Sequence, residues 1–296
     1  MQIWIKVATF IFLYILFYSI FTGVTTVPAE GDSLSYHIPI AQTVLTGEFL
    51  HPHYKLLYEH KYAWDRMYFP AASELILALF LLFHVPLNLY NVLAWVLLLI
   101  SGYLLARSYK LDSKFALIFA FTICTLNTVL RWLNSQTVDI WLAVFFMLSL
   151  ALLQKPKGTI FYFVKLGFVL GMLFGTKYSG SSFAIVLLIL YGFSLLKYIN
   201  LQKFIGFAIP FSLLGVFWYL RNYLATGNPI FPVGVSYIRG GQVMGIQVWQ
   251  SFLHYPVDMF NSLILEFRIW SSVLLVPLLY LGYIIFRKMG GVTNYI

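Results

Sequence analysis

Charged residues are scarce in this sequence, and cysteine is nearly absent. Of the 296 residues, 10% are charged and 61% belong to the apolar set AVILMFWYC, whereas a soluble globular domain carries about 25% charged and about 45–50% apolar residues. This balance excludes a soluble globular domain, a disordered chain and a collagen-like chain. The single cysteine, Cys124, excludes an internal disulfide and with it a disulfide-rich secreted module. The class that remains is a membrane protein that crosses the bilayer several times.

Several catalytic motifs are also missing. The sequence contains no G-x-S-x-G, no P-loop and no C-x-x-C, so a hydrolase nucleophile elbow, nucleotide binding and dithiol redox chemistry have no support. The formal charge of +9 does not indicate nucleic-acid binding, because the basic residues stand singly or in pairs between apolar runs instead of clustering on one soluble face. We therefore expect no nucleic-acid partner, and we interpret the basic residues as a topology signal.

Long apolar runs recur along the chain. A membrane-spanning helix needs about 20 apolar residues to cross a hydrocarbon core of about 30 Å. The first run exceeds the apolar region of a signal peptide and no small-x-small cleavage site follows it, so we interpret it as a permanent anchor. The runs that we interpret as spans are Ile3–Gly23, Pro86–Ala106, Phe115–Leu130, Thr137–Leu153, Thr159–Gly175, Ser181–Leu196, Phe204–Leu220 and Leu263–Phe286.

A further apolar run, Ala71–Phe83, has a length typical of an interfacial or re-entrant helix. The distribution of basic residues decides whether it crosses, because they concentrate on the cytoplasmic side of a membrane. If the run does not cross, one side receives these cations, opposed only by Asp112: Lys6, Arg107, Lys110, Lys114, Lys155, Lys157, Lys197, Lys203, Arg287 and Lys288. The other side receives Glu30, Asp32, Glu48, Glu59, Asp65, Glu74, Asp139 and Asp258. We therefore predict eight spans in the cell membrane, with both termini cytoplasmic.

The chain has no fixed-period repeat and no linker that would mark a second domain, so residues 1–296 are predicted to form a single membrane module without a separate soluble domain. Two long outer loops remain, at about 24–69 and 221–262. Loops carry most of the chemistry on such a scaffold. Both loops are rich in aromatic residues, which most often form an interfacial belt.

The first outer loop carries an acidic candidate, Asp32. Asp32 and Tyr36 are four residues apart and would share one face of a helix, while Leu34, Ile38, Ala41 and Leu45 would form a second, apolar face. This pattern predicts a helix on the membrane with a carboxylate at its start. Two roles for Asp32 stay open at this point, helix cap and catalytic group.

A second acidic candidate, Asp139, lies at the outer start of the fourth predicted span. An ionisable group at the membrane boundary is a functional hypothesis by default. The alternative is a helix-dipole role in the first turn, which we rank lower because Ser135 or Thr137 could cap that helix instead.

Two cations lie on the same predicted side, Lys177 between the fifth and sixth spans and Arg221 at the end of the seventh. Each alone is typical of a membrane anchor. Together with the two acids they suit a substrate that carries both a hydroxyl and a phosphate. His51 and His53 lack a fixed third ligand, so we expect neither a metal site nor a cofactor.

Five segments, taken in order, resemble the GT-C glycosyltransferases, and more narrowly their dolichyl-phosphate-mannose protein mannosyltransferase and aminoarabinose transferase branch. The segments are Gly31–Pro39 (GDSLSYHIP), Tyr68–Glu74 (YFPAASE), Asn134–Asp139 (NSQTVD), Gly175–Lys177 (GTK) and Arg221–Pro232 (RNYLATGNPIFP). The similarity covers most of the chain, and the set is more specific than any one segment. The sequence departs from the family in two ways, since Ser33 follows Asp32 where many relatives have a second acid, and most relatives are longer.

The resemblance implies membrane-parallel helices in the first outer loop and a sugar donor linked to polyprenyl phosphate. It implies that Asp32 is the catalytic acid of that loop, that Asp139 is a second acid, and that Lys177 and Arg221 contact the carrier phosphate. Their neighbours Tyr36, His37, Tyr178 and Asn222 are the further substrate-binding candidates. In the implied reaction, Asp32 is the general base for an acceptor hydroxyl on a glycan, lipid or protein, and transfer inverts the sugar on the extracytoplasmic face.

Two other functions are weighed against this one. A transporter or flippase of lipid-linked sugars would need polar residues deep in the spans, and these spans are nearly free of them. A truncated, non-catalytic scaffold with the same fold is the third possibility. The enzymatic hypothesis predicts that Asp32, Asp139, Lys177 and Arg221 gather around one lipid-accessible cavity.

Overall fold

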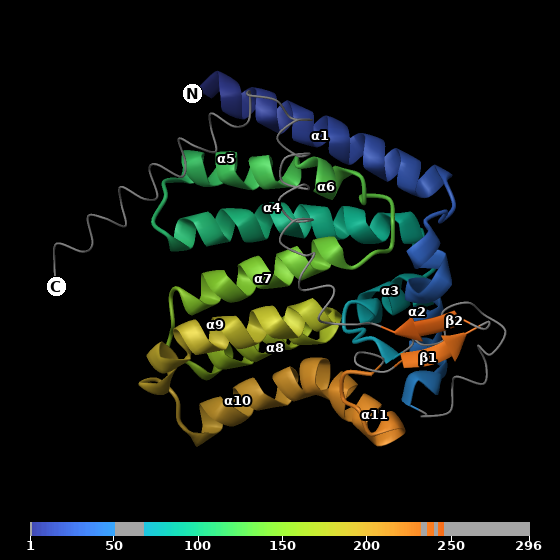
Figure 1. Ribbon diagram of the computed structural model, residues 1–296. Helices are drawn as coiled ribbons and strands as arrows, with labels where there is room; N and C mark the ends of the chain where they lie inside the picture. The colour runs from blue at the N-terminus through green and yellow to red at the C-terminus, as the bar shows by residue number, and fades with distance from the viewer. Residues whose placement is uncertain (1, 51–67, 232–235, 240–241, 246–296) are drawn as a thin grey trace.

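A computed structural model describes residues 2–50, 68–231, 236–239 and 242–245 of the chain (Figure 1). Within these residues the chain is helical apart from one antiparallel hairpin, in which β1 (Ser236–Arg239) pairs with β2 (Gln242–Gly245). The hairpin lies in the second predicted outer loop, where no strand was predicted. The expected helical class is confirmed in outline.

The helices follow the predicted apolar runs closely. In chain order they are α1 (Gln2–Thr25), α2 (Ile38–Thr46), α3 (Glu74–Leu82), α4 (Tyr90–Ser108), α5 (Ser113–Cys124), α6 (Asn127–Leu130), α7 (Asp139–Leu153), α8 (Ile160–Thr176), α9 (Tyr178–Leu196), α10 (Leu201–Phe211) and α11 (Phe217–Thr226). A π-helical segment, Ser33–His37, leads into α2, and another, Ser212–Val216, joins α10 to α11 after Pro210. Short 3-10 turns occupy Glu48–Leu50 and Leu87–Leu89.

The long helices lie side by side in a row whose order differs from their order in the chain. Helix α1 contacts α5, α5 contacts α4, α4 contacts α7, α7 contacts α8, and α8 contacts α10, while α9 packs beside α7 and α8 (Figure 1). Helices α2 and α3 pack together beside one set of helix ends, which form one end of the row in the direction of the helix axes. That end, where α1 finishes and α7, α9 and α11 meet the connecting segments, carries the candidate site.

Local signals explain several helix ends. The Asp112 carboxylate accepts hydrogen bonds from the backbone N–H groups of Lys114 and Phe115 (2.9 and 3.0 Å) and caps α5. Helices α2 and α11 both finish at a glycine with φ of 75°, Gly47 and Gly227, a conformation that glycine adopts without strain.

Among the described residues, four helical stretches are long and apolar enough to cross a membrane, Ile5–Thr25, Leu87–Ser108, Tyr178–Leu196 and Leu201–Thr226. Helices α5, α7 and α8 are apolar but shorter. The eight predicted spans are therefore not confirmed, and the last of them, Leu263–Phe286, lies outside the described residues. The third predicted span is interrupted, since α5 ends at Cys124 and has 12 residues, about 18 Å of helix against a hydrocarbon core of about 30 Å. The apolar helices indicate a membrane protein.

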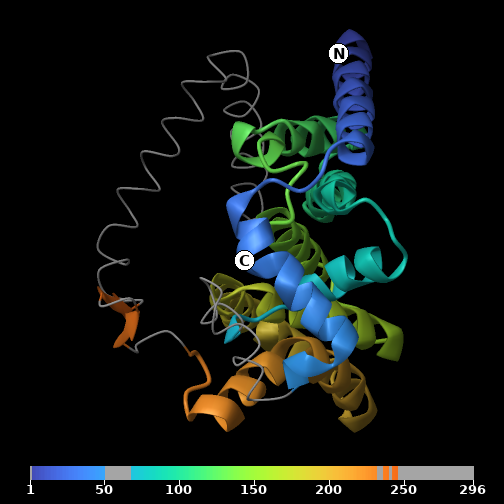
Figure 2. The same cartoon turned by 90° about the vertical axis from the view of Figure 1, so that its right-hand side faces the viewer.

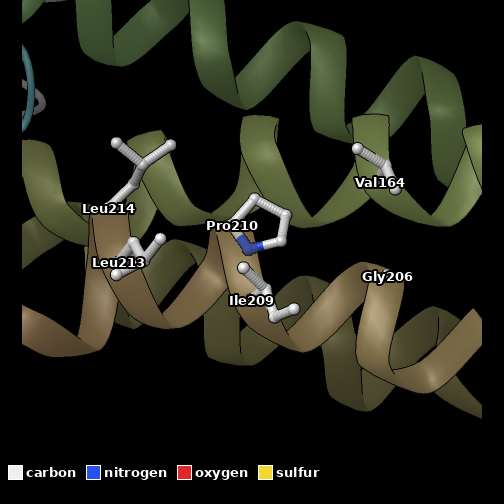
Figure 3. A pocket seen from close by; sticks show the side chains of 6 residues that line it. All are labelled: Val164, Gly206, Ile209, Pro210, Leu213 and Leu214. Atoms are coloured by element: carbon white, nitrogen blue, oxygen red, sulfur yellow. The ribbon is translucent and has the colours of Figure 1, made fainter.

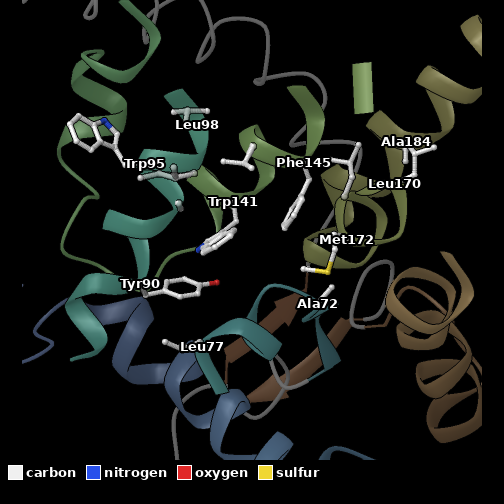
Figure 4. Packing of buried hydrophobic residues seen from close by; sticks show 14 of the residues in the cluster. Ala72, Leu77, Tyr90, Trp95, Leu98, Trp141, Phe145, Leu170, Met172 and Ala184 are labelled. Carbon is white, nitrogen blue, oxygen red and sulfur yellow. The ribbon is translucent and has the colours of Figure 1, made fainter. Parts of the chain in front are cut away.

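Large aromatic side chains fill the centre of the row (Figure 4). The ring of Trp95 on α4 stacks on Phe12 of α1 with centroids 4.2 Å apart, and its Nε1–H donates to the carbonyl of Cys124 on α5 (2.8 Å). On the other side of α4, the ring of Tyr90 lies 5.2 Å from that of Trp141 on α7. The tryptophans thus join α1, α5, α4 and α7 into one core.

Candidate active site

The sequence-predicted site residues lie at one end of the helix row. Asp139 begins α7, Lys177 joins α8 to α9, and Arg221 lies within α11. The segment that begins near Asp32 continues into α2, which crosses this end and faces the viewer in Figure 2. The outer loops predicted at 24–69 and 221–262 are partly helical, because α1 runs on to residue 25 and α11 runs on to residue 226.

Glu30, and not Asp32, caps the outer helix, which comprises residues 33–46, the π-helical segment and α2. The Glu30 carbonyl accepts the N–H of Leu34 (3.1 Å), and its carboxylate accepts the backbone N–H groups of Asp32 (2.9 Å) and Ser33 (2.7 Å). Partial burial acts to raise the pKa of Glu30, but these hydrogen bonds and the nearby His37 outweigh it and hold the pKa below its ordinary value of 4.5. The cap alternative for Asp32 is therefore wrong, and Asp32 is an exposed residue of the first helical turn.

Ser33 joins the start of the outer helix to the segment before α7. Its buried hydroxyl donates to the Glu30 carboxylate (2.6 Å) and accepts the backbone N–H of Gln136 (2.9 Å). Ser33 follows Asp32 directly, and a further acid, Glu30, stands two residues before Asp32. The serine thus links two segments that are far apart in the sequence.

Amide side chains fix the Asn134–Asp139 segment. Asn134 Nδ2 donates to the carbonyls of Ser19 (3.0 Å) and Asn88 (3.3 Å), and Gln136 Nε2 donates to Asn88 Oδ1 (2.8 Å). These bonds tie the segment to the end of α1 and to the start of α4. The amides of this motif therefore hold the backbone in place, and Asp139 is the residue of the motif that points to solvent.

Asp139 forms an ion pair with Lys177. The Lys177 Nζ lies 2.9 Å from Asp139 Oδ1, and the two side chains are about half exposed, at 47% and 51%. Helix α7 has no side-chain cap hydrogen bond, so the expected cap by Ser135 or Thr137 is not formed. The pair brings two of the predicted site residues together directly.

Arg221 lies in a different environment, buried within α11. Its guanidinium donates to Asn222 Oδ1 from Nε (3.2 Å) and Nη2 (2.8 Å) and lies 5.1 Å from the centre of the Trp218 ring. Burial raises the pKa of Tyr68, and the neighbouring Arg221 charge offsets part of that rise. Arg221 also lines an apolar pocket of about 250 Å³ together with Leu50, Phe217, Leu220, Leu224 and Ala225.

Tyr178 and Asn222 hold the ends of the two outer loops together. Asn222 Nδ2 donates to the Tyr68 carbonyl (2.6 Å) and to the Tyr178 hydroxyl (3.2 Å), and the Tyr178 hydroxyl contacts the carbonyl of Phe231. Tyr68 lies at the end of the first loop and Phe231 within the second. Tyr178 and Asn222 were predicted to bind substrate. In the structure they contact each other and the two loops, which the sequence did not indicate.

Tyr36 and His37 face protein neighbours. The Tyr36 ring lies 4.1 Å from the His37 ring and 6.1 Å from Phe69, which lies 5.7 Å from Tyr178. His37 Nδ1 lies 2.7 Å from the Glu74 carboxylate, and both side chains are 3% exposed. The rings form a continuous aromatic row from the outer helix to the α8–α9 junction, while His37 is not accessible enough to contact a substrate.

A larger pocket lies elsewhere and has no polar groups. Its volume is about 420 Å³, and it opens on the outer face of α8 and α10 beside Pro210 (Figure 3). The lining residues are Val164, Gly206, Ile209, Pro210, Leu213 and Leu214. Such a groove can contact hydrocarbon only, so it adds no chemistry to the site.

Of the four side chains predicted to gather around one cavity, two are in contact with each other. Asp139 touches Lys177, whereas the pocket that Arg221 lines includes none of the other three. Within the described ranges, no group of three or more His, Cys, Asp or Glu side chains has the arrangement of a metal site. His51 and His53 lie outside the described residues.

The opposite end of the row carries several basic residues. Lys155 Nζ, after α7, donates to the carbonyl of Arg107 at the end of α4 (3.0 Å), and Lys197 and Lys203 flank the α9–α10 connection. The charge partition read from the sequence therefore corresponds to two ends of one helix row in the part of the chain that the structure describes.

Comparisons with known proteins identify neither a family nor a relative of this chain. No protein-family model matches the chain, and searches of curated proteins and of solved structures find no match. The function must therefore be argued from this site alone.

Sequence reasoning missed Glu30, Ser33, Gln136 and Glu74 as parts of the site. An acid just before a helical pattern is a recognised start signal, and it could have identified Glu30 as the cap. For Ser33 and Gln136 no local signal exists, because their hydrogen bond joins residues 103 positions apart.

Proposed function

We propose that the chain is a membrane glycosyltransferase. It moves a sugar from a polyprenyl-phosphate carrier to a hydroxyl of a glycan, lipid or protein, at the extracytoplasmic face of the cell membrane. Both substrates are lipid-associated or reach the membrane surface, which fits a site at the end of a row of apolar helices.

The observation that carries the proposal is the position of Arg221. Arg221 lines a pocket whose other walls are Leu50, Phe217, Leu220, Leu224 and Ala225. An apolar wall beside a cation suits an amphiphile with a hydrocarbon chain and an anionic head, and a guanidinium can bind phosphate with two hydrogen bonds. An exposed carboxylate, Asp32, lies at the same end of the row.

The proposed reaction needs a base and cations at separate positions. The acceptor hydroxyl oxygen attacks C1 of the sugar from the side opposite the carrier, and Asp32 takes the hydroxyl proton. The bond between C1 and the phosphate oxygen breaks, and its electron pair stays on that oxygen. Lys177 leaves Asp139 and binds the phosphate. Together with Arg221, it offsets the charge of the departing group. Attack from the opposite side inverts the anomeric configuration.

Donor recognition is tested by binding. Purified chain in lipid nanodiscs is titrated with decaprenyl phosphate and, separately, with decaprenol. We expect Arg221→Gln to weaken decaprenyl phosphate binding about 10-fold to 100-fold, since a hydrogen bond to a charged group contributes about 1.5–3 kcal/mol. Decaprenol binding should not change. The matched control is Arg107→Gln at the opposite end of the row, and equal losses in the two variants would contradict the assignment.

Transfer is tested with decaprenyl-phosphate sugars carrying mannose, glucose or arabinose and a panel of hydroxyl acceptors. We expect Asp32→Asn to lower turnover by about 10² to 10⁴ while donor binding stays unchanged. Asp112→Asn at the other end is the control, because asparagine caps a helix as well as aspartate does. Undiminished turnover in Asp32→Asn would remove Asp32 as the base, and donor binding with no transfer would favour the transporter or scaffold alternative.

A further inference from the structure

A buried pair of ionisable side chains, His37 and Glu74, lies beneath the exposed site. His37 Nδ1 and Glu74 Oε1 are 2.7 Å apart, with 3% of each side chain exposed. The Ser73 hydroxyl donates to the other Glu74 oxygen (3.0 Å), and the Tyr90 hydroxyl donates to the Ser73 carbonyl (3.0 Å).

Stability does not explain why this pair is present. Removing two charges from water costs about as much as their attraction returns, and an apolar pair of similar volume is often neutral or more stable. The best supported role of buried charged or polar pairs is to select one register among several similar packings.

The pair is one of two polar anchors on the same face of the outer helix. Ser33 binds the backbone N–H of Gln136, and His37, four residues later, binds Glu74 at the start of α3. One anchor leaves a helix free to pivot and turn. Two anchors, to two different parts of the bundle, fix both its rotation and its position along its axis.

Asp32 depends on these anchors because it lies on the exposed side of the same turn. A slip of one residue moves a helical position by about 1.5 Å along the axis and turns it by about 100°. Such a change would move Asp32 relative to the bundle on which the outer helix packs.

We propose that His37 and Glu74 are a positioning pair, which sets the register of the outer helix on α3 and thereby the place of Asp32 at the end of the bundle. The consequence for catalysis rests on the proposed glycosyl transfer, whereas the register itself does not.

The register is measured by the distance between two spin labels. The labels replace Leu34, which is 52% exposed on the outer helix, and Ser179, which is exposed at the start of α9, in a Cys124→Ala background. In the double variant His37→Leu/Glu74→Leu we expect a shifted or broadened distance distribution without a lower Tm. The neutral but hydrogen-bonding pair His37→Gln/Glu74→Gln should restore the narrow distribution.

The matched control is Thr43→Val on α2. Thr43 is buried, and its hydroxyl donates only within its own helix in the described contacts, to the Ile40 carbonyl (2.7 Å), so its loss should leave the distribution unchanged. If the double leucine variant does not fold, His37→Phe/Glu74→Gln carries the test, because it keeps the ring, the Ser73 bond and the volume. An unchanged distribution in the folded variant would overturn the proposal, whatever happens to its Tm.

Activity gives a separate readout. In the double leucine variant we expect kcat to fall about 100-fold, the loss that a displacement of about 1 Å can cause, with KM for the donor little changed. If the wild-type chain transfers no sugar, the proposed function fails and the distance measurement still decides the role of the pair.

Discussion

Glu30 and Asp32 stand two positions apart in the sequence. Their carboxylates have different surroundings and therefore different roles. Glu30 accepts hydrogen bonds from two backbone N–H groups and from the Ser33 hydroxyl. Asp32 makes no cap hydrogen bond and is exposed. Composition and spacing indicated an acid at this helix start, but they did not indicate which acid would cap it, because the choice depends on where the backbone turns.

The Glu30 cap predicts a stability that depends on pH. Its pKa is lowered in the folded protein, so the ionised form stabilises the fold above the ordinary value of 4.5 and the contribution is lost as the pH falls through the lower, folded-state pKa. Glu30→Gln should therefore lower the Tm near neutral pH. The difference in Tm between the variant and the wild type should shrink as the pH falls below 4.5. Thermal unfolding in detergent across this range measures the effect, and a difference that did not vary with pH would contradict it.

Helix α8 shows how one element depends on small residues. Gly167, Gly171 and Gly175 recur every four residues, and a Cβ atom at Gly167 or Gly175 would come within 2.1 and 2.0 Å of the carbonyl oxygens of Phe207 and Leu214. The glycines therefore let α8 approach the α10–α11 helix closely, as small residues do between membrane helices. The regular spacing is visible in the sequence, whereas its partner is visible only in the structure.

Substitution of these glycines tests the close packing. We expect Gly167→Ala and Gly175→Ala each to destabilise the protein by about 1–3 kcal/mol, because the methyl group has no space beside a backbone carbonyl. The control is Gly192→Ala in α9, where a Cβ atom meets nothing within 4 Å. That change should be neutral or stabilise by up to about 1 kcal/mol, since alanine favours a helix over glycine. Equal effects in all three variants on unfolding in detergent would rule out the packing explanation.

The molecule separates its charges between the two ends of the helix row. One end carries the candidate site, and the other carries Arg107, Lys155, Lys197 and Lys203 among its basic residues. The positive-inside rule predicts that the basic end lies in the cytoplasm. The candidate site would then face the other side of the membrane.

Labelling in intact cells tests this orientation. A cysteine in place of Leu34 should react with a membrane-impermeant maleimide added outside, whereas a cysteine in place of the exposed Lys157 should react only after the cells are opened. Cys124 is buried and provides a silent background. The reverse labelling pattern would place the site in the cytoplasm and end the proposed extracytoplasmic reaction.

The amino-acid sequence by itself determined the class of protein and most helix positions, because apolar composition and run length are local properties of the chain. It also indicated Asp139, Lys177 and Arg221 as charges at one end. It could not show that Asp139 binds Lys177, that Ser33 binds Gln136, or that α5 ends early at Cys124. These features were decided by the tertiary structure, since each depends on which side chains meet when distant segments pack together.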